Sequence, residues 1–502
     1  MRAGARIAAI VASLVLAGCA AEPKPPNLGT LYDSAAQIES PNRHPVISIP
    51  GTLGSRLVDR ETGVVMWGGA SGLSVDPEDP DNARLIALPI GHGDETLREL
   101  KDNVRPDGVL RVARASVFGL PLELDIYRGV ISTLIAGGFD FRETREEEIN
   151  DRKVNLDSFE FPYDWRRDNV EAAHDLDYFI KRKTAQVMET RQSVFGASEE
   201  DVKFDLIAHS MGGLVTRYYL MYGDADLPAD GSLPEVTWAG AKHVGRVVFI
   251  APPNTGSVLA FENLVNGKTF GPLQPTYPPA LIGTHVSTYE LFPRARHNRV
   301  RLKGSEEPLD IFDVGNWDRY GWGILNPTQD ALLAELMPDE PTAEGRRVRA
   351  YHYLARVLAR AEQFQRAIDR PVEVPPGLEL YLVVGGGFET PAAVEYDPET
   401  KRVEITKLEE GDGVVLRASS LNDERQDGNY TLALRSPIQY RSVLLLPEEH
   451  VDITKSAVFG DNLLFWLLEA PRTGDQLVRP GRLSLAGAPS EGRAATSPPA
   501  EK

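Results

Sequence analysis

The 502-residue sequence has little of three features that would point to other classes of protein. It has a single cysteine, which excludes an internal disulfide framework. Basic residues number 54 against 73 acidic ones, and no basic cluster occurs, so we expect no nucleic-acid partner and no attraction to anionic lipid. No His/Cys/Asp group has metal-ligand spacing and no phosphate-binding glycine loop is present, so we expect neither metal nor other cofactor.

The first twenty residues carry an export pattern. "MRAGARIAAIVASLVLAGCA" has two arginines, an apolar stretch at 7–16 that is too short to span a bilayer, and small residues before Cys19. The pattern resembles bacterial lipoprotein signals, which are cut before a cysteine whose thiol then carries lipid. We therefore predict a signal peptide at 1–18 and a membrane anchor at lipidated Cys19. The location would be the cell envelope, with the outer membrane facing the periplasm favoured because Ala20 is not an aspartate.

Composition divides the rest of the chain. Residues 19–44 are rich in proline and polar residues and are predicted to form a tether, and 471–502 lack an apolar period and are predicted to be a disordered tail. A single globular domain is expected over 45–470. Two stretches, about 56–120 and about 255–372, break its pattern and are predicted to be insertions that form cap and membrane-facing regions. The sequence carries no signal of an oligomeric state.

Within the domain, short β-rich runs alternate with helical stretches. The strand-like runs are continuous in hydrophobicity, as in central strands that are buried on both faces. The alternation predicts a mostly parallel sheet covered by helices. The predicted strands are 45–51, 159–165, 202–210, 243–253, 378–387 and 441–450, and the predicted helices include 126–141, 174–191, 211–223, 349–368 and 456–470.

A candidate nucleophile lies where a predicted strand turns into a helix. In "LIAHSMGG", Ser210 follows His209 and is flanked two residues away by the small residues Ala208 and Gly212. This arrangement is typical of the nucleophile elbow of the α/β-hydrolase fold, which presents a serine hydroxyl above the sheet at a helix N-terminus. A serine that simply caps the helix is the alternative interpretation.

The acid and base of a serine triad should follow in the order Ser, Asp, His, each after a late strand. "EEGDGVVLRASS" offers Asp412 between two glycines, and "SVLLLPEEHVDITKS" places His450 in a loop after the last strand. His450 would accept the proton of Ser210, and Asp412 would hold the imidazole tautomer. Taken singly, each could be an ordinary loop residue.

An oxyanion hole requires two backbone N–H groups. One is expected from Met211, the residue after the serine, and the other from the loop after the first strand, "VISIPGTLGSRL". There Gly51 permits a tight turn and Thr52 can present its N–H group. A plain turn at a strand end is the alternative.

Seven segments together resemble a known family. "IPGTLGSRL", "FPYDWRRDN", "AHSMGG", "APPNTGS", "STYELFPR", "GDGVV" and "EEHVDI" occur in the order of the lecithin:cholesterol acyltransferase family. The resemblance covers roughly 45–470 and implies an α/β-hydrolase fold with the triad and oxyanion residues named above. It also implies that Tyr163, Asp164 and Trp165 support the site, and a purely structural role for this tripeptide is the alternative. Gly51, His209 and Gly212 are further candidates for supporting the site. Two departures are the absence of a disulfide and the distinct segment 255–372, so substrate specificity is not carried over.

The sequence thus predicts a serine-dependent lipid esterase or acyltransferase. It would cleave acyl esters of glycerolipids, with phospholipid or another acyl-ester lipid as substrate, through an acyl-serine intermediate that water or an alcohol resolves. Trp67 and the loop 270–281 are candidates for a lipid-facing surface and a lid. Two alternatives remain: a carboxylesterase or polyester hydrolase on the same scaffold, and a non-catalytic lipid-binding envelope lipoprotein.

Overall fold

The computed structural model describes residues 40–470, apart from short internal gaps at 70–71, 94, 118–119, 126, 140–156, 197–200, 270–275 and 424–435. The predicted signal peptide, Cys19, most of the tether and the tail lie outside the described residues. None of the helices in the described part is long and apolar enough to cross a membrane.

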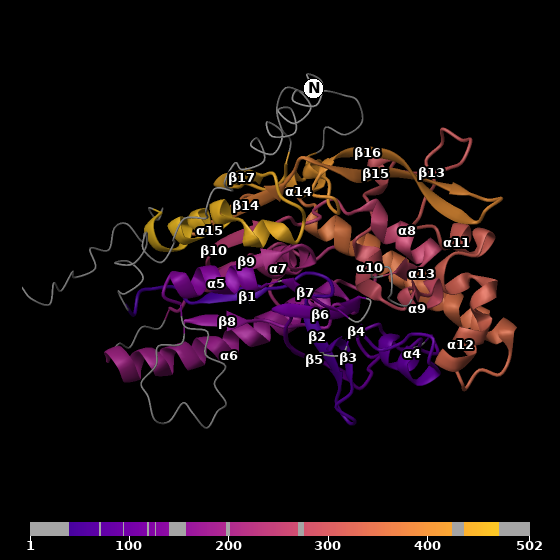
Figure 1. Cartoon of the computed structure of the whole chain (residues 1–502), viewed down its shortest axis with the longest axis horizontal. Coiled ribbons are helices and arrows are strands. Elements are labelled where there is room, and N and C mark those ends of the chain that lie inside the picture. Colours follow the sequence, from indigo (N-terminus) through magenta and orange to yellow (C-terminus); the bar gives the residue numbers. More distant parts are fainter. Residues whose placement is uncertain are drawn as a thin grey trace, which may run out of the picture.

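A central sheet of six strands forms the middle layer of the molecule (Figure 1). Every neighbouring pair in it runs parallel, which confirms the predicted fold class. Its inner strands are fully buried because their side chains are apolar on both faces. In spatial order the strands are β17 (Ser442–Leu446), β14 (Glu379–Gly385), β10 (Val244–Ile250), β9 (Phe204–His209), β1 (Val46–Ile49) and β8 (Ser158–Glu160).

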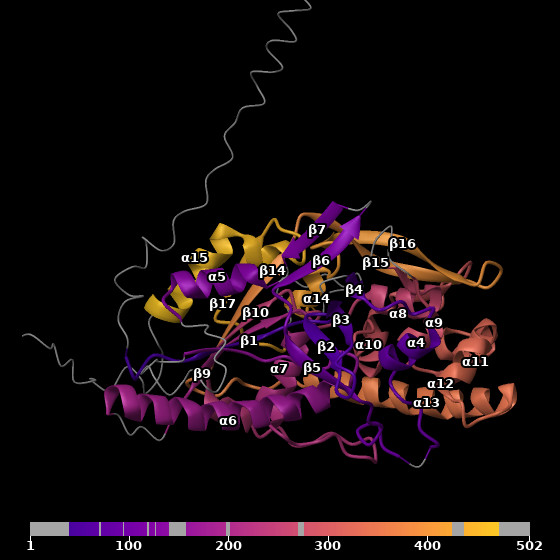
Figure 2. The ribbon, with the colours of Figure 1, turned by 60° about the horizontal axis from the view of Figure 1, so that its bottom comes forward.

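Helices cover the two faces of this sheet (Figure 2). On one face Ile207 of β9 packs in a cluster with α5 (Arg128–Ala136) and α15 (Ala457–Leu464). On the other face Leu206 and Ala208 pack in the main core, beneath α6 (Asn169–Phe195) and α7 (Met211–Tyr222). Neighbouring residues of one strand therefore supply two different cores, as the alternation of side chains along a strand requires.

The first predicted insertion forms regular structure that the sequence pattern did not indicate. It contains an antiparallel sheet in the order β4-β3-β2-β5, the helix α4 (Pro80–Ile86) and an antiparallel hairpin that runs slightly past it. The strands are β2 (Ser55–Asp59), β3 (Val65–Gly69), β4 (Gly72–Ser74), β5 (Val104–Val109), β6 (Val112–Val117) and β7 (Leu120–Asp125).

The proposed lipid-facing role of Trp67 is wrong. Its side chain is only 3% exposed and packs edge-on against Trp165, with ring centroids 5.7 Å apart. The indole N–H donates a hydrogen bond to the carbonyl of Leu53 at 2.8 Å. Trp67 therefore belongs to the core, because the small antiparallel sheet folds its own apolar face inward against the loop after β1.

The second predicted insertion is mainly helical and carries an aromatic core of its own. Phe261, Tyr289, Phe292, Trp317 and Trp322 contact one another at centroid distances of 5.0–6.1 Å. Its longest helix is the predicted one, extended at its N-terminus. The helices are α8 (Val258–Asn266), α9 (Pro279–Ile282), α10 (Val286–Glu290), α11 (Val314–Tyr320), α12 (Asp330–Leu336) and α13 (Ala343–Ile368). Part of the proposed lid loop, 270–275, lies outside the described residues.

A second unexpected element is a long hairpin between β14 and the last part of the chain. Strands β15 (Phe388–Asp397) and β16 (Arg402–Gly411) pair antiparallel, and β13 (Val300–Leu302) joins them in a three-stranded sheet. In β16 only Val403 and Gly411 are buried. The hairpin carries the chain from the central sheet to the loop that holds Asp412.

Candidate active site

Ser210 lies at the turn between β9 and α7 in a conformation that is rare for a residue with a side chain. Its φ is 53° and its ψ −126°. Such strain costs on the order of 1–3 kcal/mol and is maintained by the surrounding structure. Here the Ser210 N–H donates to Ile250 at 2.8 Å, and the side chain makes no capping hydrogen bond to α7. The helix-cap interpretation therefore does not describe this serine.

The elbow requires small residues on both sides of the serine. A Cβ atom at Gly212 would overlap the carbonyl oxygen of Pro50, so α7 can meet the end of β1 only through a glycine. A Cβ at Gly51 would lie 2.7 Å from the Cβ of Ser210. Ala208 is fully buried at the end of β9. These contacts hold the serine directly against the loop after β1.

Ser210, His450 and Asp412 form a hydrogen-bonded line. His450 Nε2 lies 3.0 Å from Ser210 Oγ, and His450 Nδ1 lies 2.7 Å from Asp412 Oδ2. The second carboxylate oxygen of Asp412 accepts backbone N–H groups from Val414 at 3.0 Å and Val415 at 2.7 Å. Because these bonds orient the carboxylate toward Nδ1–H, Nε2 is left to accept the serine proton.

The loops that carry Asp412 and His450 meet at the end of β14. A Cβ at Gly385 would lie 2.6 Å from the Cβ of Asp412 and 2.7 Å from the carbonyl oxygen of Glu448. The two loops are also joined directly, because the His450 N–H donates to the carbonyl of Asp412 at 3.0 Å. Asp412 follows β16 of the outer three-stranded sheet rather than a strand of the central sheet.

The two predicted oxyanion donors are neighbours. The Thr52 hydroxyl contacts the sulfur of Met211 at 3.2 Å. Met211 begins α7, where an N–H has no acceptor within the helix. Among the described residues, neither its N–H nor that of Thr52 has a hydrogen-bond acceptor. Both groups are thus unengaged beside Ser210.

Aromatic side chains hold the loop that carries Thr52. The Tyr163 hydroxyl donates to the carbonyl of Pro50 at 2.9 Å, and the Trp165 indole N–H donates to the carbonyl of Ser55 at 3.2 Å. Two of the three residues in the "YDW" segment therefore contact this loop directly.

Asp164, the middle residue of that segment, has a different partner. Both of its carboxylate oxygens accept hydrogen bonds from the fully buried Arg166, at 2.9 and 2.7 Å. Burial opposes ionisation of Asp164, but the guanidinium outweighs it and keeps the pKa of this carboxyl below its ordinary value. Arg166 also binds the carbonyls of Leu85 and Ile86 and the carboxylate of Asp102. Asp164 thus anchors the first insertion through Arg166, and within the described part of the chain it forms no hydrogen bond with Ser210, His450 or Asp412.

Sequence reasoning missed one residue of the site, Tyr127. Its hydroxyl accepts the Gly51 N–H at 2.7 Å and lies 2.9 Å from His209 Nδ1, and His209 Nε2 lies 3.1 Å from the carbonyl oxygen of His450. Burial, with a smaller contribution from His450, lowers the pKa of His209 to about 3, so this histidine is neutral. An aromatic residue just before a helix carries no local signal of such a contact.

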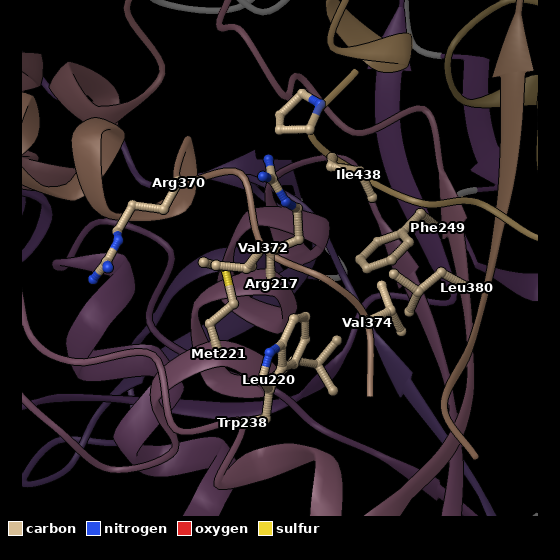
Figure 3. Close-up of a pocket in the computed structure, with 11 residues that line it drawn as sticks. Arg217, Leu220, Met221, Trp238, Phe249, Arg370, Val372, Val374, Leu380 and Ile438 are labelled. Carbon is tan, nitrogen blue, oxygen red and sulfur yellow. The ribbon is translucent and has the colours of Figure 1, made fainter. Parts of the chain in front are cut away.

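The crevice drawn in Figure 3 is separate from the triad. It lies between α7, β10 and β14, and residues such as Arg217, Trp238 and Phe249 line it. Its volume is about 30 Å³, room for one or two water molecules, so it cannot hold an acyl chain. Over the ranges that the structure describes, no group of three or more His, Cys, Asp or Glu residues could hold a metal ion.

The fold and the elbow place the protein among the α/β-hydrolases. The lecithin:cholesterol acyltransferase family matches residues 153–418, just over half of the chain, and the chain belongs to this family. It is accordingly an enzyme of the hydrolase and acyltransferase class that acts on lipid esters. The matched stretch includes Ser210 and Asp412 but not Thr52 or His450.

One solved structure shares the fold of this chain at low sequence identity. A chain in the crystal structure of the Tle4–Tli4 complex is 15% identical, with a TM-score of 0.53, over 85% of this chain and 99% of that one. Lipase 1 from Pelosinus fermentans is 13% identical, with a TM-score of 0.34, over 86% of this chain and 100% of that one. No curated protein sequence matches the chain.

We predict that Gly212→Ala displaces the elbow. The added methyl group overlaps the backbone of β1, so α7 must shift, which should cost about 1–3 kcal/mol of unfolding free energy and about 100-fold in esterase activity. Urea unfolding and hydrolysis of a soluble ester would measure both. Gly315→Ala, whose nearest atoms belong to the Asp313 side chain, is the control and should change neither appreciably. A fully active Gly212→Ala protein with unchanged unfolding would contradict this account.

The neutral state of His209 makes stability depend on pH. Its folded pKa of about 3 lies below the ordinary value of 6.5, so the unfolded chain binds an extra proton between these values. The unfolding free energy should therefore fall as pH drops from 6.5 toward 3. His209→Gln removes this titrating group. In urea unfolding at several pH values, the slope of the unfolding free energy against pH should therefore decrease by the equivalent of up to one bound proton. Identical slopes in the two proteins would refute the assignment.

Proposed function

We propose that this chain is a serine lipid esterase that works through an acyl-serine intermediate and cleaves acyl esters of glycerolipids. The observation that carries the proposal is the hydrogen-bonded line from Ser210 through His450 to Asp412 at a strained elbow. Family membership supports the acyl-ester chemistry. A lipid-binding protein without catalysis has no use for a strained serine with a base in hydrogen-bonding distance.

Each residue has one task in the proposed reaction. His450 Nε2 takes the proton of Ser210 as the hydroxyl attacks the ester carbonyl, and Asp412 stabilises the resulting imidazolium. The N–H groups of Thr52 and Met211 donate to the oxyanion. His450 then protonates the departing alcohol or lysolipid, and it activates water or a second alcohol to release the acyl group.

Apolar residues beside the acid and the base support a lipid substrate. Val414 lies two residues after Asp412 and is 41% exposed, and Val451 follows His450 directly and is 38% exposed. The polar carboxylate and imidazole are themselves buried, at 2% and 8% exposure. A substrate that reaches Ser210 past these loops therefore meets apolar side chains, which suits an acyl chain better than a charged group.

Ser210→Ala should lower turnover by about a million-fold, as loss of a triad nucleophile does. The test is mass spectrometry of products from phospholipid vesicles, with and without a long-chain alcohol. Free fatty acid with lysolipid would identify a phospholipase, and a fatty ester of the alcohol would identify acyl transfer. Cleavage of a soluble ester alone would remove the phospholipid part of the proposal. Full activity in Ser210→Ala would remove all of it.

We also propose that the enzyme is held on a membrane of the cell envelope, with the outer membrane favoured, through lipid on Cys19. The export pattern before this residue supports the anchor. Cys19→Ser should move the protein from the membrane fraction to the soluble fraction and leave hydrolysis of a soluble ester unchanged. Persistence in the membrane fraction would exclude lipid on Cys19 as the anchor.

A further inference from the structure

We propose that Tyr127 and His209 are positioning residues that join the loop of the oxyanion hole to the backbone of the catalytic base. This inference rests on the proposed function, because it concerns the same triad. Tyr127 lies just before α5 and His209 just before Ser210, and among the described residues neither side chain forms a hydrogen bond with Ser210 Oγ. They act on the reaction only through the two backbone segments at their ends.

Gly51, Tyr127, His209 and His450 form a chain of hydrogen bonds, and the backbone groups at its two ends fix the direction of each bond. The Gly51 N–H can only donate, so the Tyr127 oxygen accepts from it and the Tyr127 hydroxyl proton is free to donate to His209 Nδ1. The ring proton of His209 is then on Nε2, and it donates to the carbonyl of His450. All the hydrogen bonds thus point in one direction, from the backbone N–H of Gly51 to the backbone carbonyl of His450.

Only neutral His209 fits this arrangement. A histidine protonated on both nitrogens would donate from Nδ1 to the Tyr127 oxygen, which reverses that hydrogen bond and leaves the Tyr127 hydroxyl proton without His209 as its acceptor. Burial keeps the pKa of His209 near 3, so the ring stays neutral under physiological conditions. Burial also raises the pKa of Tyr127 far above its ordinary value, so its hydroxyl keeps the proton that it donates.

The peptide between Pro50 and Gly51 is held on both sides. Tyr163 donates to its carbonyl at 2.9 Å and Tyr127 accepts from its N–H at 2.7 Å. A peptide unit is planar, so two opposed hydrogen bonds fix its orientation. The next peptide along the chain carries the Thr52 N–H. The Tyr127 hydroxyl therefore sets the direction of an oxyanion donor, although it does not touch the oxyanion.

The imidazole of His209 also packs between the two partners. Its centroid is 5.5 Å from the Tyr127 ring and 4.9 Å from the His450 ring. A Cβ at Gly54 would lie 2.8 Å from the Tyr127 ring, so the tyrosine is confined from the other side. Displacement of any one ring therefore moves the others, and the spacing between the oxyanion loop and the base depends on all three.

The test compares Tyr127→Phe with Tyr222→Phe in the full-length protein. Tyr222 lies at the far end of α7, and its hydroxyl donates to the buried carbonyl of Ala367 at 2.9 Å. Tyr222→Phe is therefore the matched control, because it also removes one buried tyrosine hydrogen bond but at a site away from the triad. With a soluble short-chain ester, Tyr127→Phe should lower kcat by about tenfold to a hundredfold and leave KM within about twofold. The rate of inactivation by a fluorophosphonate should fall in parallel, because its phosphoryl oxygen occupies the oxyanion hole.

Two substitutions of His209, the middle residue of the hydrogen-bond chain, test whether its two hydrogen bonds are needed. Glutamine can accept from Tyr127 through its carbonyl and donate to His450 through its amide, whereas leucine can do neither. His209→Gln should therefore retain most of kcat, and His209→Leu should lose it to the same extent as Tyr127→Phe. Equal loss in both His209 variants would overturn the proposal. So would a kcat for Tyr127→Phe equal to that of Tyr222→Phe.

Ser210→Ala separates failure of this inference from failure of the proposed function. Loss of activity and of fluorophosphonate labelling in Ser210→Ala, together with full activity in Tyr127→Phe, would overturn the positioning role alone. Persistent activity in Ser210→Ala would overturn the triad and this inference with it. Thermal unfolding of all variants shows whether the losses in rate exceed the fraction of unfolded protein.

Discussion

The geometry of the site depends on the close approach of two backbones at Gly212. The first turn of α7 lies against the end of β1, and any Cβ at this position would overlap the Pro50 carbonyl. That approach forces the chain to turn sharply at Ser210, which accounts for its positive φ. It also sets Gly51 against Ser210, so the serine and the loop that carries Thr52 are positioned by the same contact. A bulkier residue here would separate Ser210 from the loop that carries Thr52.

His450 and Asp412 belong to loops that leave different sheets, and both residues are held where these two loops meet. Asp412 follows an outer hairpin and His450 follows an edge strand, yet both loops pack on Gly385 at the end of β14. The backbone hydrogen bond from His450 to Asp412 ties one loop to the other. Two backbone N–H groups then orient the carboxylate. The imidazole is therefore held by a rigid sheet end rather than by the length of either loop.

The sequence could predict the central sheet and the trio because both have local signatures. Buried parallel strands are continuous apolar runs, and Ser210 and His450 each follow such a run. Asp412 was singled out instead by its place between two glycines and by the chain order Ser, Asp, His. The hairpin of β15 and β16 could not be predicted, because most residues of β16 are exposed and charged and show no alternation of apolar and polar side chains. The lipid-facing role of Trp67 was predicted wrongly because the sequence around an isolated aromatic residue does not indicate which face of a small sheet carries its side chain. Tyr127 was missed because its partners, Gly51 and His209, are 76 and 82 residues away.

Four aromatic side chains determine how firmly the loop after β1 is held. Tyr163, Tyr127, Trp67 and Trp165 bind successive backbone groups of Pro50, Gly51, Leu53 and Ser55, and all four side chains are at most 5% exposed. Donors that are fixed before the substrate arrives need no reorganisation as charge develops on the carbonyl oxygen. On the proposed mechanism this stabilisation is the same whether the acyl group leaves to water or to an alcohol, since both reactions pass through an oxyanion at the same place. The choice of acceptor therefore depends on the surroundings of the acyl-serine and not on the oxyanion hole.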